Sequence, residues 1–183
     1  ADNCTDATAR VARDAGAVVY ERFNKQQVGK GYALNYLIQQ IRDAWGDDYF
    51  DGYFVFDADN LLQPDYISRM NEVFGEKYQI VTSYRNSKNY GDNWISAGYA
   101  LWFLREAAFL NAPRFRLGIS CMVSGTGFLF SRDIMLRHGG WPFHTLTEDI
   151  EFSAHNIVQG ERIGYCGDAE FFDEQPTLFT QSW

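Results

Sequence analysis

Two carboxylates stand one residue apart directly after an apolar run. Asp57 and Asp59 follow residues 53–56, whose continuous apolar side chains predict a central strand that is buried on both faces. Carboxylate oxygens at such a strand end suit Mg²⁺ or Mn²⁺, and either ion can also bind the phosphates of a substrate. Asn60 and Pro64 are turn-forming residues, so the same segment is also typical of a plain turn. The spacing alone leaves both interpretations open, a metal site and a turn.

A second pair of acidic residues, Glu148 and Asp149, follows Thr147 where a helix is expected to begin. In a crevice beside a sheet, one of them could act as a general base that accepts a proton from a substrate. Acidic side chains are also favoured in the first turn by the helix dipole, and Thr145 with Glu148 matches a capping box. Catalysis and helix capping both remain open for this motif.

Two glycine-containing segments could bring a basic group or the backbone close to a ligand. Gly29, Lys30 and Gly31 precede a predicted helix, where Lys30 could contact a phosphate, although a solvated loop lysine is slightly favoured. The segment is not a P-loop, because Asn24 occupies the position of the first glycine. Residues 124–127 read Ser-Gly-Thr-Gly, which either admits a ligand close to the backbone or forms a tight turn.

The elements that must position these residues alternate between helix and strand. Helix-periodic apolar residues at 33–45 precede the strand at 53–56, and Pro64 suits the first turn of the next helix, 64–74. This alternation predicts an α/β fold with a doubly wound, mostly parallel sheet, helices on both faces, and ligands at the carboxyl ends of the strands. The other predicted elements are a short helix ended by Gly16, strands at 17–20, 79–82, 128–130, 163–166 and 169–172, and helices at 94–110, 131–138 and 147–159.

The helix expected at 94–110 is strongly aromatic and contains Trp94 and Trp102. We expect it to belong to the core, although its two tryptophans would also suit a membrane interface. No stretch of the sequence reaches the roughly 18 apolar residues of a membrane-spanning helix. In this region Arg105 and Glu106 interrupt the apolar run.

The overall composition restricts the class of partner. The chain has 183 residues, of which 46% are hydrophobic and 17% aromatic, enough for one packed domain. Its 24 acidic and 16 basic residues give a formal charge of −8, which argues against broad electrostatic binding to nucleic acid. Three scattered cysteines, Cys4, Cys121 and Cys166, indicate a reduced compartment and no disulfide framework.

The order of these motifs resembles that of the processive type of family 2 glycosyltransferases, the group of cellulose, chitin, hyaluronan and poly-N-acetylglucosamine synthases. Order and approximate spacing agree along nearly the whole chain, so the resemblance is more specific than any single motif. The matching segments are residues 1–6, 29–35, 57–59, 124–127 and 147–149.

The resemblance implies a GT-A fold of Rossmann-like type and transfer with inversion from a nucleotide-diphosphate-sugar, such as a UDP-sugar, to a glycan or lipid-linked hydroxyl. Asp149 would be the catalytic base, and Glu148 would support it or the acceptor pocket. The residues that would hold the donor with Mg²⁺ or Mn²⁺ are Asp2 at the uridine, Lys30 in the nucleotide region, and Asp57 and Asp59, which would also bind the metal. The acceptor pocket would consist of Ser124, Gly125, Thr126, Gly127 and Thr147.

The same resemblance predicts that residues 1–183 form a single catalytic domain truncated at both ends. The family's opening strand and its Gln-x-x-Arg-Trp motif are missing, and residues 181–183 look like the segment just before that motif. Membrane helices outside this soluble fragment would hold it at the cytoplasmic face of the cell membrane. Two alternatives stay open: a nucleotidyltransferase that makes nucleotide sugars, and a non-catalytic module that binds nucleotide or glycan.

Overall fold

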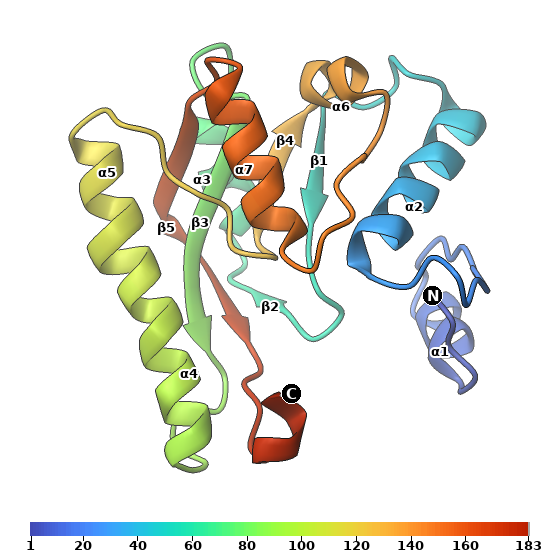
Figure 1. Cartoon of the computed structure of the whole chain (residues 1–183), viewed down its shortest axis with the longest axis horizontal. Coiled ribbons are helices and arrows are strands. Elements are labelled where there is room, and N and C mark those ends of the chain that lie inside the picture. The colour runs from blue at the N-terminus through green and yellow to red at the C-terminus, as the bar shows by residue number, and fades with distance from the viewer. Residues whose placement is uncertain (183) are drawn as a thin grey trace.

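The computed structural model describes residues 1–182 and shows a five-stranded mixed sheet with helices on both faces (Figure 1). The strands lie in the order β1–β4–β3–β5–β2. Their bounds are β1 Gly52–Val55, β2 Leu61–Leu62, β3 Ile80–Ser87, β4 Phe128–Ser131 and β5 Ile163–Asp173. The helices are α1 Thr8–Asp14, α2 Lys30–Trp45, α3 Tyr66–Val73, α4 Trp94–Arg105, the π-helix η1 Glu106–Asn111, α5 Ala112–Arg116, α6 Arg132–His138, α7 Glu148–Val158 and the 3₁₀-helix η2 Phe179–Ser182. Trp183, which ends the segment compared with the family's Gln-x-x-Arg-Trp region, lies outside the described residues.

The prediction of a mostly parallel sheet is wrong. Only β3 and β5 pair in parallel among the described strands, whereas β1–β4, β3–β4 and β2–β5 are antiparallel. The reason is the extended segment before β4, which crosses from one end of the sheet to the other. Cys121 donates its backbone N–H to the carbonyl of Ile163 at the start of β5, and Gly127 donates to Val55 at the end of β1, each at 2.9 Å. β4 therefore begins beside the end of β1 and runs in the opposite direction.

Alternating side chains of the strands form two apolar layers, one on each face of the sheet. In β1, Tyr53 and Val55 join the layer that α2, α6 and α7 cover, and Phe54 joins the layer against α3. Phe152 of α7 and Met70 of α3 are completely buried in these layers. Helices cover both faces of the sheet, as predicted. They must do so because both faces are apolar and could not remain in water.

Several predicted elements differ in extent from the observed ones. Residues 17–20 form no strand. The two strands predicted at 163–166 and 169–172 are one strand, β5, whose register against β3 shifts between Ser83 and Tyr84. The helix predicted at 94–110 consists of α4 and η1 and continues into α5.

We expected the aromatic helix to place its tryptophans in the core, and this prediction is wrong. α4 buries the small side chains of Ser96 and Ala100, whereas Trp94 and Trp102 are 78% and 60% exposed. A helix can approach a sheet closely through small residues, so its large side chains are left on the outer face. Within residues 1–182, no helix has the length and apolar character needed to cross a membrane.

Candidate active site

Residues 124–127, which we call the glycine turn, lie immediately before β4. Thr126 donates its backbone N–H to the carbonyl of Ser124 at 2.7 Å. Gly125 and Gly127 have φ values of +70° and +67°, a conformation that L-residues with side chains rarely adopt. A Cβ at Gly127 would also lie 2.1 Å from the ring of Phe171. The tight-turn interpretation is confirmed, and both glycines are required by the backbone.

Lys30 joins the glycine turn to the acidic motif after β1. It is the first residue of α2, and its ammonium pairs with the carboxylate of Asp57 and donates to the carbonyl of Gly125 at 2.7 Å. The side chains of Lys30 and Asp57 are 29% and 42% exposed, so a ligand can reach both from solvent. α2 approaches closely because residue 31 is glycine: a Cβ there would lie 1.9 Å from the carbonyl oxygen of Phe143.

The acidic pair at the start of α7 also lies at the glycine turn. A Cβ placed on Gly125 would be 3.8 Å from Oδ2 of Asp149. Glu148 is buried, and its burial raises the pKa of its carboxyl group; the negative charges of Asp149 and Asp57 act in the same direction, and Lys30 opposes them. Three of the predicted motifs therefore meet around Gly125.

The predicted capping box at the start of α7 is wrong. Thr145 Oγ1 donates to the carboxylate of Glu151 at 2.9 Å, and Thr147, at the N-cap position, makes no side-chain capping bond and is exposed. α7 is held instead by Ser153, whose Oγ accepts the backbone N–H of Val123 at 3.1 Å. Glu148 and Asp149, in its first turn, are thus positioned by packing against the chain before the glycine turn.

The backbone of Asp57 is fixed by a turn. Its N–H donates to Thr126 Oγ1 at 2.9 Å, and its carbonyl accepts the N–H of Asn60 at 3.1 Å. The side chain of Asp59 is exposed and accepts two long hydrogen bonds of 3.3 Å, from the side chain of Asn60 and from the backbone of Glu174. The turn interpretation of this motif is confirmed, and it leaves the carboxylate of Asp59 open to solvent.

The carboxylates of Asp57 and Asp59 fit a metal ion that is also bound by a phosphate ligand. Within residues 1–182, no group of three or more His, Cys, Asp or Glu side chains is placed to hold a metal. Mg²⁺ that arrives with a nucleotide needs only one or two protein carboxylates, since phosphate oxygens and water fill its other positions. Asp57 and Asp59 suit an ion shared with a phosphate ligand and do not form a closed protein cage.

Asp2 does not join the other predicted site residues. Its carboxylate pairs with the buried guanidinium of Arg22 at 2.6 Å, in the segment that precedes α2. Beside this pair, a hollow of about 480 Å³ is lined by polar and aromatic side chains, among them Arg22, Tyr32 and His144. The rings of Tyr32 and His144 stack with their centres 4.1 Å apart.

Sequence reasoning missed a buried polar network beside the glycine turn. Asp173, the last residue of β5, pairs with the guanidinium of Arg85 and accepts a hydrogen bond from Asn60 at 3.0 Å. Arg85 also donates to the carbonyl of Ser124 at 3.1 Å and lies 3.4 Å from the ring centre of Phe103. The network ties the motif after β1 to the glycine turn. The sequence signal for this network was Asp173, an acidic residue at the end of a strand. We predicted that strand to end at residue 172, one residue before Asp173.

Glu106 is the second residue that sequence reasoning missed. It opens the π-helix η1, and its Oε2 accepts a hydrogen bond from Ser124 Oγ at 2.9 Å. Burial raises the pKa of Glu106, the Ser124 bond and Arg85 oppose this, and the charge of Asp149 raises it further. π-helical turns are frequent at functional sites, but no pattern in the aromatic segment predicted one.

Comparison with known proteins identifies a family. The family described as glycosyltransferase-like family 2 matches residues 1–183. No curated protein matches the chain significantly.

Proposed function

Because the chain belongs to the glycosyltransferase-like family 2, we propose that it transfers a sugar from a UDP-sugar to a hydroxyl of a glycan or lipid-linked acceptor, with inversion. Membership of this family favours glycosyl transfer over nucleotidyl transfer or a purely binding role. The observation that carries the proposal is the meeting of Lys30, Asp57 and Asp149 at Gly125. The GT-A arrangement and the processive synthase type belong to the same proposal, and they rest on the order of the motifs.

At the donor side, Lys30 and the two acids after β1 would hold the diphosphate. Lys30 already donates to two oxygens, so it can exchange one of them for a phosphate oxygen without leaving its place at the start of α2. Asp57 and Asp59 would hold Mg²⁺ or Mn²⁺, which stabilises the negative charge of the departing diphosphate. Asp2, paired with Arg22, would contact the uridine, and the hollow beside α2 that Arg22 lines would supply polar and aromatic surroundings for it.

At the acceptor side, Asp149 would take the proton of the attacking hydroxyl. Such a hydroxyl is too weakly acidic to attack unaided, so a carboxylate must remove its proton as the new bond forms. Glu148 is buried beside Asp149 and would support it, whereas the exposed Thr147 and the glycine turn (Ser124, Gly125, Thr126, Gly127) would border the acceptor. Attack in line with the leaving diphosphate inverts the anomeric carbon.

The place of the reaction is also part of the proposal. The processive synthases that the motif order resembles work at the cytoplasmic face of the cell membrane, and we propose the same place for this protein. The support is that resemblance alone.

The donor site is tested by the affinity of the protein for UDP. We expect UDP to bind at least about tenfold more tightly with Mn²⁺ than with EDTA, a difference of about 1.4 kcal/mol, and Asp59→Asn to abolish that difference. Isothermal titration calorimetry measures both quantities. Asp51→Asn is a matched control, because Asp51 precedes the other end of β1 and is 93% exposed. Equal affinities with Mn²⁺ and EDTA in the unaltered protein would refute the assignment.

A further inference from the structure

An exposed stripe of large apolar side chains runs along α4 and η1. The stripe consists of Trp94, Leu101, Trp102 and Phe109, which are 78%, 54%, 60% and 74% exposed. Their spacing of seven, one and seven residues places them on one side of a helix. With α5, this helical stretch of residues 94–116 is roughly 35 Å long, so the stripe forms an extended edge of the molecule.

The helical stretch that carries the stripe has a net positive charge, whereas the whole protein is acidic. Residues 94–119 contain three arginines and one glutamate, a formal charge of +2, while the chain carries −8. The glutamate, Glu106, turns inward to Ser124, so the exposed charges on this helical stretch itself are Arg105 and Arg116. Acidic groups lie at its two ends: Asp92 is exposed two residues before Trp94, and Glu72 and Asp168 line a hollow together with Arg116. Arg105 lies with its guanidinium 5.4 Å from the ring centre of Trp102, and Arg116 is exposed one turn beyond η1.

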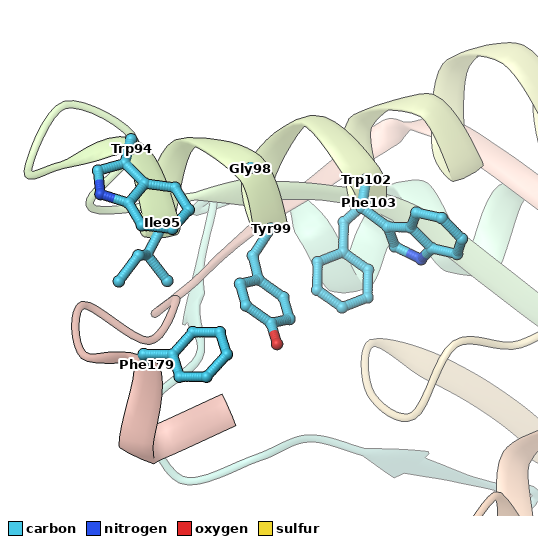
Figure 2. A pocket seen from close by; sticks show the side chains of 7 residues that line it. All are labelled: Trp94, Ile95, Gly98, Tyr99, Trp102, Phe103 and Phe179. Carbon is cyan, nitrogen blue, oxygen red and sulfur yellow. The ribbon is translucent and has the colours of Figure 1, made fainter. Parts of the chain in front are cut away.

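An apolar groove opens beside the stripe. It has a volume of about 390 Å³, and none of the described residues that line it is charged. Figure 2 shows Trp94 at one end of the groove and Trp102 at the other, with Tyr99 between them and Phe179 of η2 facing them. Among the described lining residues, the polar side-chain groups are the hydroxyl of Tyr99 and the indole N–H groups of Trp94 and Trp102, so the surface is mainly apolar and suits hydrocarbon chains.

We propose that this stripe and groove form a surface that binds an anionic phospholipid bilayer. Indole rings are preferred at the boundary between headgroups and acyl chains, and arginines beside them attract anionic headgroups. The local positive charge is complementary to an anionic membrane surface. It would give no attraction to a neutral or cationic partner. This surface-bound mode needs no membrane-spanning helix, and the inference rests on the surface alone, whatever reaction the protein catalyses.

The orientation that follows would bring the candidate active site close to the bilayer. Phe103 lines the groove and also lies against Arg85, whose guanidinium holds the carbonyl of Ser124 in the glycine turn. Phe103 thus contacts both the apolar groove and the network that reaches the glycine turn.

Co-sedimentation with vesicles tests the proposal. We expect the protein to bind phosphatidylcholine vesicles that contain phosphatidylserine, and the double variant Trp94→Ser with Trp102→Ser to bind at least about tenfold more weakly. Arg105→Gln with Arg116→Gln should remove the preference for vesicles with phosphatidylserine. The matched control is Val11→Ser with Val158→Ser, which changes apolar side chains that are 60% and 84% exposed but lie outside the stripe. This control should bind like the unaltered protein.

Three results would overturn the proposal. The first is the absence of vesicle binding, and the second is equal binding by the tryptophan variant and the unaltered protein. The third is a dimer, detected by light scattering without vesicles, that the tryptophan variant dissociates, because the stripe would then be a protein interface. All substituted side chains are exposed, and matching circular dichroism spectra will verify that each variant is folded. Vesicle binding is measured without any sugar substrate, so it can fail or succeed independently of the proposed reaction.

Discussion

Asp149→Asn is expected to lower turnover by about 10²-fold or more, the scale usual for removal of a general base. Asparagine keeps the shape of the side chain but cannot accept the proton of the acceptor hydroxyl. Affinity for the nucleotide sugar should stay within a few-fold, because Lys30 and Asp57 are unchanged and Asp149 acts on the acceptor. Steady-state kinetics, together with calorimetry of UDP binding, separate the two effects.

Two neighbouring variants make this prediction specific. Glu151→Gln alters the same helical turn but not the glycine turn, since Glu151 binds Thr145, and it should retain near-normal turnover. Glu148→Gln should reduce turnover less than Asp149→Asn does. If Glu148→Gln abolished turnover and Asp149→Asn did not, the roles of the two acids would be reversed. If neither variant changed turnover, Glu148 and Asp149 would have only a structural role at the start of α7.

Asp173→Ala is expected to destabilise the protein by about 3–5 kcal/mol, the range typical of removing one partner of a buried ion pair. The side chains of Asp173 and Arg85 are only 5% and 14% exposed, so the variant would leave a guanidinium charge unpaired in the interior. Asn60 and Gln175 would also lose the oxygens to which they donate. Urea unfolding measures the change.

The matched control is Asp51→Ala at the surface. Asp51 is 93% exposed and lies 3.6 Å from Arg132, so its loss should cost less than about 1 kcal/mol. A loss for Asp173→Ala no larger than that of the control would show that the network does not hold the glycine turn in place.

Much of the fold could be predicted from local patterns. The helical periodicity at 33–45 lies in α2 as predicted, and residues 53–55 of the predicted strand lie in β1. β1 is nevertheless an edge strand of the described sheet and not the central strand that we expected, and Phe56 lies just beyond its end. The direction of β4 could not be predicted, because it depends on how far the irregular segment before it travels across the sheet. Periodicity also cannot tell a buried aromatic face from an exposed one. In α4 the small residues Ser96 and Ala100 face inward, so our prediction that the tryptophans lie in the core is wrong.

The candidate site could be predicted in part, for a similar reason. Motifs at the ends of elements were recognisable, and Lys30, Asp57 and Asp149 do converge at Gly125. Glu106 could not be found, since its inward position depends on the hydrogen bonding of a π-helix within an aromatic segment. Whether Asp2 belongs to the donor site stays a prediction.

The most direct test of the central claim, that this site transfers sugar with inversion, is NMR analysis of the product formed from a panel of UDP-sugars. The protein is incubated with each donor, Mn²⁺ and candidate acceptors, and the anomeric configuration of the new linkage is read from its proton coupling. The account predicts that at least one α-linked UDP-sugar is consumed and yields a β-linked product. An α-linked product would contradict inversion by a single in-line attack, and failure of every UDP-sugar to be consumed would contradict the proposed function itself.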